Sequence, residues 1–108
     1  MKYPPTKCIA VDVDGTLLVQ GKLNTRLAAI AKQKKMEGFE VILWSARGKK
    51  HAEHVAQSLG VTDCFTVIIS KPGYITDDRG WGWIKYTRWL KSYEEMEALT
   101  LGSVATPR

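Results

Sequence analysis

The stretch that decides the fold of this chain is Cys8-Ile9-Ala10-Val11-Asp12-Val13-Asp14-Gly15-Thr16, in which two carboxylates close a short apolar run. An apolar run without alternation predicts a strand buried on both faces, as in a parallel sheet. Side chains alternate along a strand, so Asp12 and Asp14 are expected to point the same way. The glycine that follows places both at the strand's carboxyl end, where open α/β sheets bind their ligands. Two like charges this close require a cation, a shared proton or solvent.

The whole chain has the size and composition of one globular unit. Its 108 residues are expected to form a single domain, 1–108. The net charge of +5 favours anionic partners such as phosphate esters or nucleic acid, without proving either. Cys8 and Cys64 are too far apart for a metal knuckle or a disulfide framework. With no leader-like segment and no apolar run of membrane-spanning length, we expect a soluble, cytoplasmic protein without membrane contact.

Hydrophobic periodicity and turn residues predict the remaining elements. In chain order they are a hairpin flap at 17–23, a helix at 25–37, a strand at 39–44, a helix closed by Gly60, strands at 65–69 and 74–76, and a helix at about 82–99. Residues 1–6 are expected to be an extended lead-in, and the chain is expected to fray from Gly102. On the first helix, Lys32, Lys34 and Lys35 are expected to lie on the solvated face.

This order of elements predicts the fold class α/β, as a three-layer α/β/α, Rossmann-like core with a small, mostly parallel sheet. Right-handed crossovers would place the carboxyl ends of all strands on one edge. Asp12, Ser45 and Asp77 would then converge there, although they are spread over most of the sequence. The expected convergence is the main argument for a functional site.

The stretch Asp12-Val13-Asp14-Gly15-Thr16-Leu17 resembles the first signature of the haloacid dehalogenase-like phosphohydrolases. The resemblance implies that Asp12 attacks phosphorus and carries an aspartyl-phosphate, while Asp14 works as general acid and base. The residue types suit these roles, because a carboxylate is a competent covalent nucleophile and a second carboxyl can transfer protons. Taken alone, the same residues also fit a strand that simply ends on a polar turn.

Later residues match the other motifs of that family, in the family's order. Ser45 matches the hydroxyl that binds the phosphoryl group, Lys71 matches the lysine that counters charge on nucleophile and phosphoryl, and Asp77-Asp78 matches the metal-binding carboxylates. Each has a plain alternative as a turn residue, a solvated charge or a helix cap. Together they predict a catalytic site of Asp12, Asp14, Ser45 and Lys71. The neighbouring residues expected to contact substrate are Gly15, Thr16, Ala46 and Arg47.

The resemblance implies Mg²⁺ as cofactor, held by Asp12, the carbonyl of Asp14, Asp77, and Asp78 directly or through water. These are hard oxygen ligands, which Mg²⁺ prefers. Zinc is disfavoured, because no Cys or His lies among the motifs. His51 and His54 are expected to flank solvent at the start of the second helix rather than to contact substrate.

No stretch has room for a cap domain, so the chain resembles the small capless members of the family, which act on large substrates or borrow a lid from a neighbouring subunit. Arg47 suits either a substrate phosphate or a salt bridge to a site carboxylate. Aromatic and basic residues interleave at 79–89. They suit stacking on nucleic acid or, as we favour, core packing and a homo-oligomer interface.

The sequence therefore predicts a hydrolase, a Mg²⁺-dependent phosphomonoesterase that forms an aspartyl-phosphate on Asp12 and acts on a phosphorylated small molecule or a larger substrate. A polynucleotide end phosphatase is the main rival within the same chemistry. A catalytically idle module that binds phosphoryl groups or nucleic acid is the rival from another class. Dehalogenase activity is disfavoured, because the dehalogenases of this family do without the second aspartate and the metal.

Overall fold

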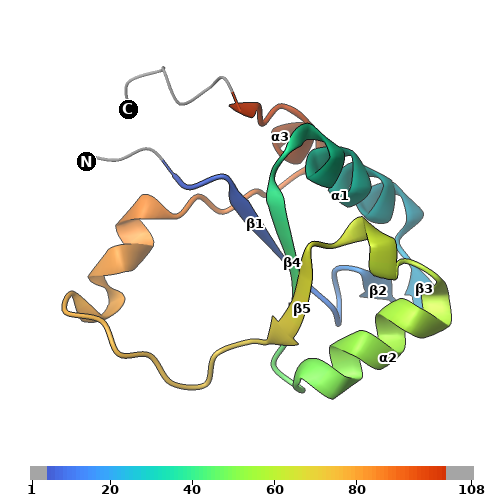
Figure 1. The fold of residues 1–108 in the computed structure, drawn as a ribbon, viewed down its shortest axis with the longest axis horizontal. Coiled ribbons are helices and arrows are strands. Elements are labelled where there is room, and N and C mark those ends of the chain that lie inside the picture. The colour runs from blue at the N-terminus through green and yellow to red at the C-terminus, as the bar shows by residue number, and fades with distance from the viewer. Residues whose placement is uncertain (1–4, 102–108) are drawn as a thin grey trace.

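The computed structural model describes residues 5–101 and is organised around a parallel sheet of three strands (Figure 1). Strand β1 (Cys8–Asp12) pairs with β4 (Glu40–Ser45), which pairs in turn with β5 (Val67–Ser70), so the strand order is β1-β4-β5. The α/β class and the small, mostly parallel sheet are confirmed. Of the expected lead-in, only the part from Pro5 is described, and the expected frayed tail from Gly102 lies outside the described residues.

The hairpin flap and the first two helices form where the sequence predicts them. Strands β2 (Leu18–Val19) and β3 (Lys22–Leu23) pair antiparallel. Helix α1 (Thr25–Glu37) begins at Asn24, whose side chain accepts a hydrogen bond from the Leu27 N–H, and ends at Gly38 in the left-handed conformation. Helix α2 (Lys49–Leu59) ends at Gly60 in the same way.

The core lies mainly on one face of the sheet. Ile9 and Val11 of β1 and Val41 and Leu43 of β4 are buried, whereas the residues between them are exposed or half-buried. Both crossover helices connect strands in the same direction, so the right-handed rule places α1 and α2 over the same buried face. The expectation that β1 is buried on both faces is wrong at Ala10, which is exposed.

Ala10 is exposed because of how the chain is arranged on the other side of the strands. There the chain forms the short 3-10 helix η2 (Gly80–Tyr86), across the strands from α1 and α2 (Figure 1). None of the η2 residues is buried, so this layer does not seal the sheet. A face that no element packs against leaves its apolar side chains in contact with solvent.

The chain after β5 departs from the prediction in two places. Residues 74–76 form no strand, and the helix expected at 82–99 is divided into η2, an extended stretch and α3 (Tyr93–Glu97). Two glycines in Gly80-Trp81-Gly82 weaken a longer α-helix. Ser92 accepts a hydrogen bond from the Glu95 N–H and so starts a new helix. In residues 5–101, no helix is long and apolar enough to cross a membrane.

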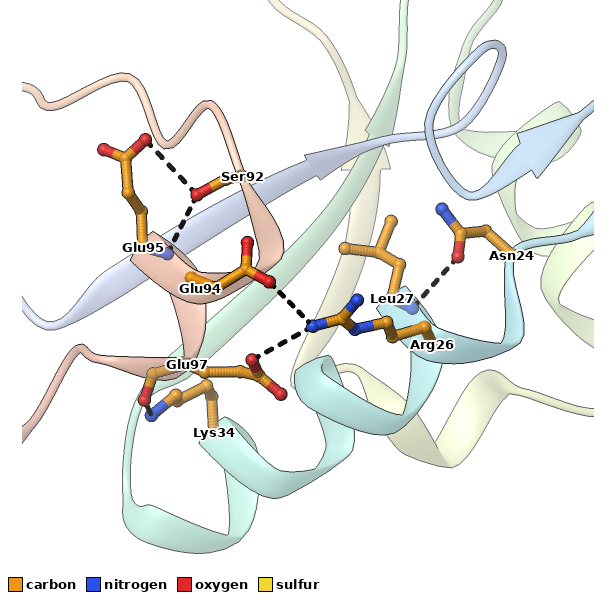
Figure 2. Close-up of polar contacts among 8 residues, drawn as sticks. All are labelled: Asn24, Arg26, Leu27, Lys34, Ser92, Glu94, Glu95 and Glu97. Atoms are coloured by element: carbon orange, nitrogen blue, oxygen red, sulfur yellow. Dashed lines mark hydrogen bonds and ion pairs between the residues drawn. The ribbon is translucent and has the colours of Figure 1, made fainter.

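Polar contacts hold α3 against α1 (Figure 2). Arg26 Nη2 lies 3.1 Å from Glu94 Oε2 and 3.4 Å from Glu97 Oε1. Lys34 Nζ donates to the carbonyl oxygens of Glu97 at 2.8 Å and of Leu99 at 2.7 Å. The expectation that Lys34 lies on a solvated face is therefore wrong: its side chain is 4% exposed, because α3 covers that part of α1.

Replacing Lys34 with methionine is expected to lower the free energy of unfolding by about 2–4 kcal/mol, because two carbonyl oxygens would lose a buried, charged donor. Chemical denaturation followed by circular dichroism measures this loss. Lys32→Met is the matched control, since the Lys32 side chain is 52% exposed and pairs with Asp63 at the surface. Equal stability of the two variants would show that the buried amine does not hold α3 in place.

Candidate active site

The two aspartates lie where β1 turns into the hairpin flap. Val13 and Leu17 beside them are fully buried, which leaves the intervening side chains directed outward. The turn is held by backbone bonds from the Leu17 N–H to the Asp12 carbonyl at 3.2 Å and from the Leu18 N–H to the Val13 carbonyl at 2.9 Å. Gly15 has φ 83°, a conformation that favours glycine. Asp12 is half-buried at the strand end, and Asp14 is exposed.

Ser45 ends the neighbouring strand, one residue beyond the position paired with Asp12. The register pairs Asp12 with Trp44 and Ser45 with Ser70. Ser45 is buried, and its Oγ accepts a hydrogen bond from the Arg47 N–H at 3.0 Å, so the hydroxyl proton remains to be donated. Its carbonyl accepts from the Lys71 N–H at 2.9 Å, which ties the loops after β4 and β5 together.

The amine of Lys71 lies on the same face of the sheet as Asp12. Lys71 Nζ is 5.8 Å from the centre of the Trp44 ring. Trp44 is the cross-strand partner of Asp12, and paired residues of parallel strands point to the same face. The lysine amine and the first aspartate thus lie on one face of the sheet, although they are far apart in the sequence.

Asp14 is approached by two side chains from beyond β4. Arg47 Nη1 lies 3.7 Å from Asp14 Oδ1, and His51 Nε2 lies 3.4 Å from Asp14 Oδ2. Of the two roles open to Arg47, the structure therefore contains the salt bridge to a site carboxylate. The expectation that His51 flanks solvent is wrong, because its side chain is only 19% exposed. His54, one turn further along α2, is exposed as expected.

His51 belongs to none of the family's motifs, so the sequence assigned it no role at the site. The available signal was its place in the first turn of a helix that starts directly after a strand end. Ala46, expected to contact substrate, is exposed in the same loop after β4. Gly15 and Thr16, expected to do the same, line a cleft of about 550 Å³ with residues from the start of α1 and from 90–96.

The acidic pair Asp77-Asp78 is not brought to the strand ends. After β5 the segment 71–79 runs away from the sheet toward η2 (Figure 1), and each of its residues is exposed. Asp77 Oδ1 accepts a hydrogen bond from the Arg79 N–H at 2.8 Å, so its carboxylate stabilises the turn before η2. The expected convergence of Asp77 with Asp12 and Ser45 is absent from the structure.

The donor set for a metal ion is accordingly partial. Among residues 5–101, no group of three or more Asp, Glu, His or Cys side chains lies close enough together to hold an ion. At the turn itself, the groups available to an ion are the Asp12 carboxylate and the Asp14 backbone carbonyl. One carboxylate is enough for Mg²⁺, which accepts one or two carboxylates and completes its shell with water and substrate phosphate.

Neither cysteine competes with Asp12 as a nucleophile. Both are free thiols, Cys8 half-buried on β1 and Cys64 buried. The pKa of Cys8 is raised mainly by burial and to a smaller extent by the negative charge of Glu40. The pKa of Cys64 is likewise raised mainly by burial and to a smaller extent by the negative charge of Asp63. Thiols with a raised pKa stay protonated at neutral pH and are poor nucleophiles.

The chain matches a model of a known protein family. A family model described as haloacid dehalogenase-like hydrolase matches residues 9–99, from β1 to the end of the described helices. The match includes the aspartates of the turn, Ser45, Lys71 and the Asp77-Asp78 pair. Comparisons with curated proteins and with solved structures give no significant match.

Proposed function

This chain belongs to the haloacid dehalogenase-like hydrolase family, and on that premise we propose that it is a Mg²⁺-dependent phosphomonoesterase that works through an aspartyl-phosphate on Asp12. The observation that carries the proposal is the placement of Lys71 Nζ over the ring of Trp44, the strand partner of Asp12. A lysine on the same face as a carboxylate, at the carboxyl end of a parallel sheet, suits a phosphoryl group, because it offsets charge on both reacting partners.

The reaction has two steps. A carboxylate oxygen of Asp12 attacks phosphorus, and the bond to the leaving oxygen breaks while Asp14 donates a proton to that oxygen. Water then attacks phosphorus and loses a proton to Asp14, the acyl-phosphate bond breaks, and inorganic phosphate and free Asp12 result. The Ser45 hydroxyl and the Lys71 amine bind the phosphoryl oxygens during both steps.

The metal ion would be held by the Asp12 carboxylate and the Asp14 carbonyl, and when bound it offsets the negative charge of the phosphoryl group. The family resemblance adds Asp77 and Asp78 as further ligands. The leaving group would occupy the cleft that Gly15 and Thr16 line, since this cleft adjoins the turn after Asp14. A capless site of this kind leaves the substrate accessible from solvent.

The direct test is turnover of p-nitrophenyl phosphate with added Mg²⁺, followed by release of nitrophenolate. A phosphomonoesterase turns the ester over repeatedly, and the wild-type protein should release many equivalents per chain. A module that only binds phosphoryl groups would release none. That outcome would leave the fold assignment in place and remove the proposed function.

We also propose that residues 74–91 form an interface with a second copy of the chain. Tyr74, Trp81 and Trp89 are 97%, 70% and 79% exposed, which is unusual for large aromatic side chains of a monomer. The core packing that we expected for this segment is not supported, since no residue of η2 is buried. Tryptophan and tyrosine are enriched at protein interfaces.

We therefore expect the protein to sediment as a dimer or larger assembly, and Trp89→Glu to shift it toward the monomer. Met36→Glu is the matched control, because Met36 is also a large, exposed apolar side chain but lies on α1. A monomer that binds oligonucleotides with an affinity that falls steeply with salt would instead favour the nucleic-acid role.

A further inference from the structure

The two oxygens of Asp14 are approached by side chains that differ in mobility. Arg47, near Oδ1, has a side chain that is 67% exposed and lies in the loop before α2. His51, near Oδ2, is 19% exposed and belongs to the first turn of α2. An exposed arginine can exchange its partner at little cost in stability. The histidine is largely buried in the first turn of a helix, which restricts its movement.

Helix α2 holds His51 in a fixed place. Ala52, Val55 and Ala56 bury one face of the helix in the core. At its start, the Lys49 N–H donates to Ser70 Oγ at 2.8 Å, which ties the first turn to the end of β5. Asp14, in contrast, is 44% exposed in a turn. The fixed partner in this contact is therefore His51, and the carboxyl is the group that needs to be oriented.

The ring nitrogen of His51 that faces Asp14 lacks a completed hydrogen bond. Nε2 is shielded from solvent and has no hydrogen-bond partner of good geometry among the described residues. A buried polar atom without a partner costs roughly 1–3 kcal/mol. The 3.4 Å separation from Asp14 Oδ2 is slightly longer than a good N–H···O bond. Hydrogen bonds at active sites are often long without substrate and shorten when it binds.

We propose that His51 is a positioning residue for Asp14. Its Nε2–H donates to Oδ2 when substrate is bound, and this leaves Oδ1 to hold the proton that passes to the leaving-group oxygen. Arg47 gives up Oδ1 at the same time and pairs with the substrate phosphate, which its exposure permits. This inference rests on the proposed function, because the orientation of Asp14 matters only if Asp14 transfers a proton.

The leaving group of the ester provides the first test. The proton from Asp14 is needed for an alkyl phosphate, whose leaving alkoxide is strongly basic, but not for dinitrophenyl phosphate, whose leaving phenolate is stable without it. His51→Phe keeps the ring volume and removes the donor. For this variant we expect kcat/KM to fall on the order of 10- to 100-fold with an alkyl phosphate. With dinitrophenyl phosphate it should stay within about threefold of wild type, because a group that needs no proton does not depend on general acid catalysis.

Two further variants separate positioning from folding. His51→Gln retains an N–H donor on a side chain of similar reach and should recover much of the activity on the alkyl phosphate. His54→Phe replaces the exposed histidine of the same helix and should leave kcat/KM unchanged with both esters. Equal losses with both esters, or no recovery with glutamine, would mean that His51 serves only the fold and would overturn the inference.

A measurement that needs no turnover addresses the contact itself. At one fixed pH, the NMR signal of the His51 Nε2 should shift in Asp14→Ala, while the signal of His54 stays unchanged. An unchanged His51 signal would overturn the inference and leave the proposed function standing. A shifted signal in a protein that hydrolyses no phosphate ester would instead reject the proposed function, and the catalytic role of His51 with it.

Discussion

Asp12→Asn is expected to abolish phosphatase turnover, with kcat lower by several orders of magnitude, on the order of 10⁴-fold or more. The reason is chemical, because Asp12 is the group that must form a bond to phosphorus and an amide is a far weaker nucleophile than a carboxylate. Asparagine has almost the same shape, so the half-buried site at the end of β1 should accept it. Steady-state kinetics with p-nitrophenyl phosphate measures the loss.

Two measurements make this prediction specific. Acid quenching of the wild-type protein with labelled substrate should trap phosphate on Asp12, and the same treatment of Asp12→Asn should trap none. Asp63→Asn is the matched control, since Asp63 is an exposed aspartate that pairs with Lys32, outside the candidate site. Near wild-type turnover by Asp12→Asn, with normal circular dichroism, would rule out the covalent mechanism.

Removing divalent metal is the second change with a large expected effect. EDTA should abolish turnover, and Mg²⁺ or Mn²⁺ should restore it, since both ions prefer oxygen ligands. Without the ion, the like charges of Asp12, Asp14 and the phosphoryl group repel one another, and attack by the carboxylate is disfavoured. Turnover that is unchanged after EDTA treatment and gel filtration would show that the site works without metal.

The same assay addresses Asp77, whose carboxylate stabilises a turn away from the strand ends. Strands of a sheet are about 4.8 Å apart, so β1 lies about 10 Å from β5 across β4. Seven extended residues span up to about 23 Å. The exposed segment from Ser70 to Asp77 is thus long enough to close over the site. We therefore expect Asp77→Asn to raise the half-saturating Mg²⁺ concentration about tenfold, by loss of one charged ligand. An unchanged requirement, equal to that of Asp63→Asn, would restrict Asp77 to its turn.

Local sequence patterns were sufficient for the first two thirds of the fold. Asn24 and Gly38 mark the ends of α1 because capping depends on backbone groups within one turn of the cap. Strands β1, β4 and β5 follow from apolar runs, and the turn after β1 follows from Asp-Gly-Thr. Since parallel strands place their carboxyl ends together, the sequence also predicted that Asp12, Ser45 and Asp77 converge. Asp12 and Ser45 do end neighbouring strands, whereas Asp77 does not reach the strand ends.

Beyond Ser70 the pattern was misleading. An apolar, aromatic-rich stretch at 74–91 predicts a strand and a long helix, but those elements need a partner to cover their apolar side chains. In the structure Ile75, Trp81 and Ile84 remain exposed. Whether such a segment folds against the sheet depends on packing over long sequence separations, which local propensity does not encode.

By itself, the sequence determined the α/β class, the turn that carries both aspartates and the chemistry available to them, because these depend on neighbouring residues. Only the tertiary structure decided the surroundings of individual charged side chains. Lys34 is buried because Glu97 and Leu99 return to α1 from far along the chain. His51 approaches Asp14 because α2 starts just after β4, the strand that pairs with β1. Burial and pairing of a charge are set by all the segments packed around it, and this arrangement forms only when the chain has folded.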